Sequence, residues 1–214
     1  MQEKKITKVT PDWRMTLIRE LKRKLIHITG LSVPVGIILF GKMTTVALIA
    51  VALAVSLVLE AGRLRGKITL PAVREHELDK TAGYVYYILG SLLTVLLFKP
   101  AVAIAAMLML SVGDAASGII GSVLRGSNVR TEESTKRIKP LPITAGMFMV
   151  CLILGYLSSG ITGLSPIVYL AGAVGATLAD GVPVYIGKRC LDDNLTIPLY
   201  AGLFMSLAGL VRLA

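Results

Sequence analysis

Seven apolar stretches divide this chain, and they constrain its fold more than any other feature of the sequence. They cover residues 25 to 41, 43 to 60, 82 to 98, 101 to 123, 141 to 158, 163 to 183 and 195 to 213. Each is close to the roughly 17 to 25 residues with which a helix crosses a bilayer, where the backbone must satisfy its own hydrogen bonds. Because 54% of the residues are hydrophobic and the mean hydropathy is +0.73, we predict an all-α membrane protein with about seven transmembrane helices. Residues 1 to 214 then form a single integral membrane domain.

The distribution of charge predicts the orientation of these helices. If the N-terminus is cytoplasmic, the inner side receives all of the 23 Lys and Arg residues except Lys42, Lys99 and Arg212. Such an excess is what the positive-inside rule describes. All 13 acidic residues also fall on the inner side or in the inner half of a span. We therefore interpret the net charge of +10 as an orientation signal and an attraction to anionic membrane lipid, with no nucleic acid as partner, and residues 1 to 17 as a basic cytoplasmic extension.

An aspartate lies deep in the fourth apolar stretch. Asp114 belongs to the segment Ser111-Val-Gly-Asp-Ala-Ala-Ser-Gly-Ile-Ile-Gly121. A carboxylate at that depth costs about 3 kcal/mol on insertion scales, so such residues usually face a polar cavity and carry function. Helical spacing places Ser117, Gly118 and Gly121 on the same face as Asp114. We interpret this face as a working site that admits a phosphate, and the alternative is a small-residue contact between helices.

A second deep aspartate, Asp180, precedes Gly181 and Pro183. These two residues should interrupt the helix, and irregular backbone at this depth is tolerated only in a protein-lined cavity. Asp114 and Asp180 both lie in the inner half of spans that run from outside to inside, so they could approach each other. Mg²⁺ favours one or two carboxylates together with substrate phosphates, which makes it the cation that the pair predicts. The alternative for Asp180 is an ordinary helix end at the membrane surface.

The helix that enters the first apolar stretch carries a third group of polar residues. Glu20, Arg23, Lys24 and His27 follow the spacing i, i+3, i+4, i+7, so they project from one helix face. Two cations beside an acid and an imidazole suit phosphate binding and proton transfer. The alternative is a basic anchor beside the membrane with an incidental histidine.

Two inner loops complete the predicted site. Residues 125 to 140 form a basic segment directly after the Asp114 helix, and this segment includes Arg137 and Lys139. It could close over a polyphosphate, or serve only as a positive-inside loop. Asp192-Asp-Asn194 precedes the last apolar stretch and could be a second cation site or a helix N-cap. The sequence has no Gly-x-x-x-x-Gly-Lys-Ser/Thr loop, so any nucleotide is held by a different arrangement.

Three of these segments together resemble the family of dolichol kinases, phytol kinases and CTP-dependent diacylglycerol kinases. They are Glu20-x-x-Arg23-Lys24-x-x-His27, Gly113-Asp-Ala-Ala-Ser-Gly-Ile-Ile-Gly121 and Asp192-Asp-Asn-Leu-Thr-Ile-Pro198. The resemblance runs from about residue 18 to 200, and the third segment is its most specific part. It departs from the family at Lys139-Pro-Leu-Pro-Ile-Thr144, which keeps the lysine of the family's Lys-Ser-x-Glu-Gly-Ser segment but not its glutamate or glycine. A deep glutamate of the family also appears here as Asp180.

The resemblance implies a Mg²⁺-requiring kinase that transfers a phosphoryl group from CTP to a long isoprenoid or lipid alcohol. Asp114 is expected to hold the metal, with Asp180 or Asp193 as helper, and either His27 or Asp180 is the candidate base. The expected nucleotide and phosphate contacts are Arg23, Lys24, Gly113, Ser117, Gly118, Gly121, Arg137, Lys139, Asp193 and Asn194.

Two other functions remain open at the level of sequence. The Gly-Asp-Ala motif is shared with CTP-dependent cytidylyltransferases that make a CDP-lipid, and intramembrane aspartates beside a broken helix also occur in transporters. In the kinase reading the protein is expected in a prokaryotic cell membrane, or in the endoplasmic reticulum membrane of a eukaryote. Its site faces the cytoplasm, and Arg23, His27, Glu60, Asp114, Lys139, Asp180 and Asp193 line one cavity that opens to the cytoplasm and to the inner leaflet.

Overall fold

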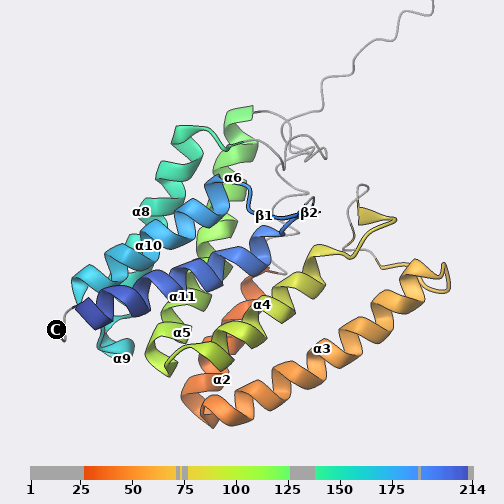
Figure 1. Ribbon diagram of the computed structural model, residues 1–214, viewed down its shortest axis with the longest axis horizontal. Helices are drawn as coiled ribbons and strands as arrows, with labels where there is room; N and C mark the ends of the chain where they lie inside the picture. The colour runs from red at the N-terminus through yellow and green to blue at the C-terminus, as the bar shows by residue number, and fades with distance from the viewer. Residues whose placement is uncertain (1–26, 71–72, 74–76, 126–137, 188, 212–214) are drawn as a thin grey trace, which may run out of the picture.

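The computed structural model of the chain describes residues 27–70, 73, 77–125, 138–187 and 189–211. Helices packed side by side make up almost all of this part of the chain (Figure 1). In chain order the elements are η1 (Thr29–Leu31), α2 (Ser32–Phe40), α3 (Lys42–Leu64), α4 (Gly83–Leu97), α5 (Pro100–Leu108), η3 (Met109–Gly113), α6 (Asp114–Arg125), α8 (Leu141–Leu157), α9 (Ser159–Thr162), α10 (Pro166–Gly181), β1 (Tyr185–Ile186), β2 (Arg189–Cys190) and α11 (Asp193–Val211). The two short strands pair antiparallel as a hairpin.

The helical character and the position of every apolar stretch agree with the sequence prediction. Among the described residues, three helices are long and apolar enough to cross a membrane, namely Lys42–Leu64, Pro100–Leu124 and Asp193–Val211. Four further apolar helices are shorter, at 10 to 17 residues. One of them, α10, has 16 residues and so spans about 24 Å at 1.5 Å per residue, less than a typical hydrocarbon layer. The helices are therefore established, whereas seven complete spans are not.

Proline and glycine set the ends of several of these helices. Pro100, Pro142 and Pro166 occupy the first turns of α5, α8 and α10, where a missing backbone N–H costs no hydrogen bond. Gly41 separates α2 from α3 with a φ of +80°, and Gly163 follows α9 with a φ of +63°. Such φ values are in the region that favours glycine, so both turns are fixed locally.

The centre of the fold is the long helix made by α5, η3 and α6, surrounded by α8, α10 and α11 (Figure 1). Glycines let α10 and α11 approach closely, because a Cβ on Gly172 would lie 2.7 Å from Met205 and one on Gly175 would lie 2.6 Å from the Tyr200 carbonyl oxygen. Small residues at helix contacts are typical of membrane proteins, where close packing replaces hydrophobic collapse. By contrast α3 lies at the edge of the fold beside α2 and α4, and its outer side is apolar and exposed.

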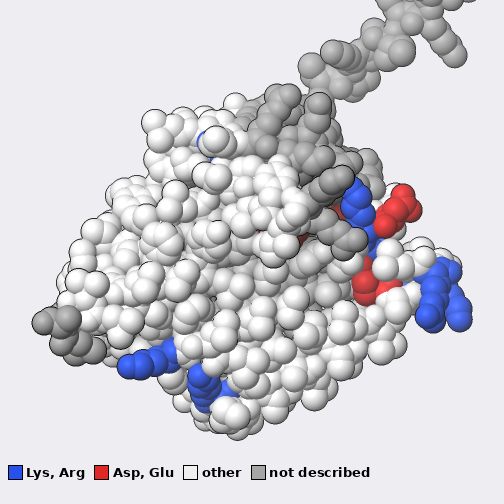
Figure 2. Space-filling view, viewed as in Figure 1, with Lys and Arg blue, Asp and Glu red and all other residues white. Residues whose placement is uncertain are grey.

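Charged side chains concentrate away from the middle of the molecule. Figure 2 shows a face covered mostly by uncharged side chains, with its acidic side chains together at one edge. At the start of α3, Lys42 Nζ donates to the carbonyl oxygens of Leu96 and Phe98, both at 3.0 Å. These carbonyls belong to the C-terminal end of α4, where a cation is favourable. The contact ties together the ends of two antiparallel helices.

The other ends of α3 and α4 are joined by a buried ion pair. Arg63 Nη2 lies 2.6 Å from Glu60 Oε1, and the two side chains are 6% and 5% exposed. Arg63 also donates to the carbonyl oxygens of Leu78 and Lys80. Glu60 accepts the backbone N–H of Ala82 at 2.8 Å and the Tyr84 hydroxyl at 2.7 Å. The pair therefore fixes the connection that leads into α4.

We expect Arg63→Met to lower the free energy of unfolding by about 3 kcal/mol, because it leaves the Glu60 carboxylate buried without its cation. Thermal unfolding of the purified protein in detergent measures the effect. Arg65→Met is the matched control, since Arg65 lies two residues after Arg63, directly after the end of α3, and is exposed. Equal shifts of the melting temperature in the two variants would show that the ion pair does not stabilise the fold.

Candidate functional site

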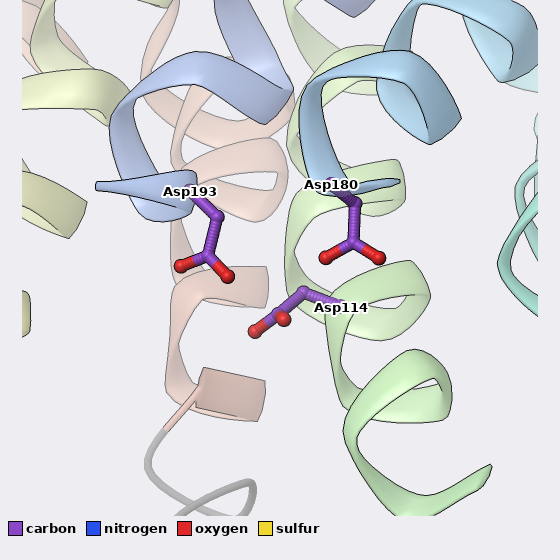
Figure 3. A group of neighbouring side chains, drawn as sticks. All are labelled: Asp114, Asp180 and Asp193. Carbon is purple, nitrogen blue, oxygen red and sulfur yellow. The ribbon is translucent and has the colours of Figure 1, made fainter. Parts of the chain in front are cut away.

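Three aspartates from three different helices meet at one end of the fold. Asp114 is the first residue of α6, Asp180 lies in the last turn of α10, and Asp193 begins α11. Each offers a carboxylate oxygen, and the three oxygens all lie within 4.8 Å of one another. Figure 3 shows the three side chains pointing toward one another. Asp114 and Asp180 are buried, with 2% and 5% of their surface exposed, so this is an acidic cluster within the protein.

A π-helical turn introduces Asp114. Residues Met109–Gly113 form this turn between α5 and α6, and the Asp114 N–H donates to the Leu110 carbonyl oxygen directly after it. Turns of this kind are rare and are frequent at functional sites. Gly113 faces α8 here, because a Cβ on it would meet the Cys151 sulfur. Its missing side chain thus serves helix packing.

The end of α10 presents Asp180. The helix ends at Gly181, as the sequence predicted, and the freed Gly181 carbonyl oxygen accepts the backbone N–H of Lys139 at 2.9 Å. A Cβ on Gly181 would lie 2.8 Å from Thr144 Cγ2 on α8. Glycine at this position therefore lets the start of α8 lie against the end of α10, which brings Lys139 beside Asp180.

Lys139 completes the cluster with a cation. Its Nζ forms an ion pair with Asp180 Oδ1 and lies 3.5 Å from Ser117 Oγ and 3.9 Å from Asp193 Oδ2. The Ser117 hydroxyl donates to the other oxygen, Asp180 Oδ2, at 2.7 Å. Both carboxylate oxygens of Asp180 are thus hydrogen-bonded, as a buried carboxylate requires.

The Asp192-Asp-Asn194 segment forms the helix N-cap that the sequence offered as one of two roles, and the cation site stays a prediction. Asp192 Oδ1 accepts the backbone N–H of Asn194 at 3.0 Å, which is the geometry of a helix N-cap for α11. Asp193, one residue further, turns into the acidic cluster. Asn194 is buried against α4, where its amide donates to the Gly83 carbonyl oxygen at 3.3 Å. The cap and the packed amide together fix where Asp193 lies.

His27 approaches the cluster from the start of the first helical segment. Its Nδ1 lies 3.2 Å from Asp114 Oδ2. The Tyr87 ring meets the imidazole edge to face with centroids 5.0 Å apart, and its hydroxyl donates to the His27 carbonyl oxygen at 3.2 Å. The same hydroxyl lies 2.7 Å from Ser111 Oγ. Tyr87 was not among the residues that the sequence predicted for the site. Its phenol hydroxyl, in a mostly apolar stretch, is the feature that could have indicated it.

The structure brings together five of the predicted site residues, namely His27, Asp114, Lys139, Asp180 and Asp193, with Ser117 beside them. Other predicted positions lie nearby without joining the cluster. Gly118 is half-buried on α6, and a Cβ on Gly121 would contact Ile143 of α8. The predicted phosphate contacts Arg23, Lys24 and Arg137 lie outside the described residues.

Glu60 differs from the prediction that placed it in the same cavity. Its hydrogen bonds in the described part of the chain go to Arg63, Ala82 and Tyr84. These partners lie at the end of α3, at the last residue of the connection and at the start of α4. The prediction grouped Glu60 with the site because of its depth in the apolar stretch alone. In the structure Arg63, three residues further along α3, pairs with Glu60 and orients its side chain.

The chemistry of the donor set suits a hard divalent cation. Carboxylate oxygens are the ligands that Mg²⁺ uses in proteins, usually one or two of them with substrate oxygens in the remaining positions. Three carboxylates face one another here beside Lys139 and His27, so several carboxylate oxygens could serve one divalent cation. The arrangement can therefore hold such an ion and orient a phosphate beside it.

Comparison of the chain with models of protein families, with sequences of characterised proteins and with solved structures gives no match.

Proposed function

We propose that the protein is an integral membrane kinase that transfers the γ-phosphoryl group of CTP to a long-chain isoprenoid alcohol of the dolichol or polyprenol type. The observation that carries this proposal is the cluster of three aspartates with Lys139 and His27 at one end of a set of apolar helices. CTP and the class of alcohol come from the family resemblance of the motifs around Asp114 and Asp193.

The position of the cluster suits a reaction in which one substrate comes from the membrane and the other from water. A lipid alcohol keeps its apolar tail among the lipids while its hydroxyl group enters a polar site, and the apolar outer surface of the helices meets the tail. The nucleotide reaches the same site from water, because Asp180 lies at the end of α10 and Asp193 at the start of α11.

The side chains of the cluster supply what phosphoryl transfer requires. Such reactions depend mostly on positioning and on stabilising charge. Asp114 and Asp193 would hold Mg²⁺, which when bound offsets the negative charge of the phosphates. Lys139 places a permanent positive charge beside the same position, and Ser117 fixes the carboxylate to which Lys139 is paired.

The contacts favour His27 over Asp180 as the base that accepts the proton of the alcohol. Asp180 accepts hydrogen bonds from Lys139 and Ser117 on its two oxygens, so each oxygen is already engaged by a donor. His27 instead has its Nδ1 beside the Asp114 carboxylate, which orients the imidazole. This is the arrangement by which a carboxylate supports a histidine base.

The proposal includes the topology predicted from charge. Seven helices cross or enter the membrane, the N-terminus is cytoplasmic, and the aspartate cluster faces the cytoplasm. Support comes from the described residues. The end of α3, the connection before α4, the end of α10 and the start of α11 carry acidic residues, whereas Lys42 lies at the opposite end of α3.

A cytidylyltransferase is the second candidate, because the same carboxylates and cation could serve attack at the α-phosphate of CTP. A kinase moves the γ-phosphoryl group to the alcohol and releases CDP. A cytidylyltransferase joins CMP to a lipid phosphate and releases pyrophosphate.

The purified protein should transfer label from γ-labelled CTP, and not from α-labelled CTP, to a polyprenol in mixed micelles with Mg²⁺. Thin-layer chromatography of the lipid phase measures the transfer. Label from α-labelled CTP in the lipid, with pyrophosphate in the aqueous phase, would identify a cytidylyltransferase. Exchange of CTP for ATP at equal concentration tests the donor.

Asp114→Asn should reduce phosphorylation of the lipid below about a tenth of the wild-type rate at saturating Mg²⁺, because it removes a metal-binding carboxylate at constant volume. Asp79→Asn is the control, since Asp79 is exposed and lies in the connection before α4. Size-exclusion chromatography in detergent checks that both variants fold. Wild-type activity in Asp114→Asn would exclude the metal role.

Single cysteines test the orientation. In a background with Cys151 and Cys190 replaced by serine, Ile186→Cys in the hairpin should react with a membrane-impermeant maleimide only from the cytoplasmic side. Ile161→Cys in α9 should react only from the opposite side, and both positions are exposed. Labelling of intact cells and of inverted vesicles distinguishes the sides. Reaction of both cysteines from one side would contradict the topology.

A further inference from the structure

The Lys139 ammonium group lies beside the carboxylates of Asp180 and Asp193. Its partners Ser117, Asp180 and Asp193 come from α6, α10 and α11, so the ammonium group sits where these three helices meet. Two-metal phosphotransfer sites hold their ions about 3.5 to 4 Å apart and bridge them with carboxylates. A carboxylate that approaches Lys139 on one side and Asp114 on the other is present here as Asp193.

The backbone holds Lys139 in this position. Its N–H donates to the carbonyl oxygen of Gly181 at 2.9 Å, and Gly181 directly follows Asp180. The main chain of the lysine is therefore tied to the residue next to its carboxylate partner, and the side chain is 19% exposed. An ammonium group anchored in this way stays within reach of Asp180 when a substrate enters.

Asp180 is occupied by this interaction. Its side chain has no exposed surface, one oxygen pairs with Lys139, and the other accepts the Ser117 hydroxyl. A metal ion bound to Asp180 would have to share an oxygen with one of these partners, and on Oδ1 its charge would lie directly beside the Lys139 ammonium group. Asp180 thus acts as the counter-ion of Lys139.

We propose that the site holds one divalent cation, between Asp114 and Asp193, and that Lys139 on Asp180 permanently replaces a second. This inference rests on the proposed function for the presence of the divalent cation. One divalent ion and one ammonium group together carry as much positive charge as the three carboxylates carry negative charge. The lysine supplies its positive charge without depending on metal concentration, and it helps to hold the phosphates that the single ion binds.

Mn²⁺ binding to the full-length protein in detergent tests the proposal. Calorimetry should give one ion per wild-type chain, and electron paramagnetic resonance should show an isolated Mn²⁺ ion. Lys139→Gln should bind two ions whose spectra are coupled, because Asp180 and Asp193 then form a second site. Lys42→Gln, at the opposite end of α3, is the matched control and should bind one ion. Two ions in the wild type, or one in Lys139→Gln, would overturn the proposal.

The double variant Lys139→Gln/Asp180→Asn separates a counter-ion from a ligand, because it removes one positive and one negative charge together. If Asp180 is only the counter-ion, the variant should bind one Mn²⁺ with an affinity within about tenfold of the wild type. Removal of a residue that supports a metal ligand lowers metal affinity by about 10- to 100-fold, and tenfold is the smaller end of that range. Loss of Mn²⁺ binding would make Asp180 a ligand and would overturn the assignment.

A wild-type protein without Mn²⁺ binding would overturn both this proposal and the metal-dependent function. A protein that binds Mn²⁺ as proposed but transfers no phosphoryl group would overturn the kinase alone.

Discussion

A buried carboxylate must be offset by a partner, and the functional end of this protein is organised around that constraint. Asp180 has no exposed side-chain surface, so it requires both the Lys139 ammonium group and the Ser117 hydroxyl. Those partners connect the segment before α8, the first turns of α6 and the end of α10. The same contacts that neutralise Asp180 therefore determine where Asp114 and Asp193 can lie. Folding of this end and assembly of the candidate site are one event.

The ion pair of Glu60 and Arg63 shows the same constraint in a purely structural setting. Its charges are satisfied by each other and by the backbone around Ala82, and they leave nothing to bind a ligand. The aspartate cluster differs because its carboxylates outnumber its described ammonium groups. An excess of negative charge at one location, rather than the presence of buried charge, distinguishes the site from the joint between α3 and α4.

The sequence predicted the helices and the convergence of the aspartates, because both follow from one-dimensional patterns. Apolar stretches specify helices, and successive antiparallel helices alternate their ends, which places Asp114, Asp180 and Asp193 at one level. Two features depend on tertiary contacts and could not be predicted. The π-helical turn at Met109–Gly113 follows from packing against α8, and the role of Tyr87 depends on the approach of His27. Helix bounds also differ from the prediction by a few residues, since α3 extends beyond the stretch 43 to 60, whereas Pro166 and Gly181 make α10 shorter than the stretch 163 to 183.

The location of Asp180 and Asp193 at helix ends suits the proposed function, in which two demands oppose each other. A charged site is costly among apolar helices, yet in that proposal a lipid alcohol carries its hydroxyl group only to the edge of the hydrocarbon layer. The end of α10 and the start of α11 would lie at that edge, and there the termini already expose backbone groups that need polar partners. The carbonyl oxygen of Gly181 and the N-terminus of α11 use Lys139 and Asp192 as such partners. The residues that pair with the backbone at these helix termini are thus adjacent to those proposed to bind phosphate. A catalytic site beside the termini therefore requires little additional burial of charge.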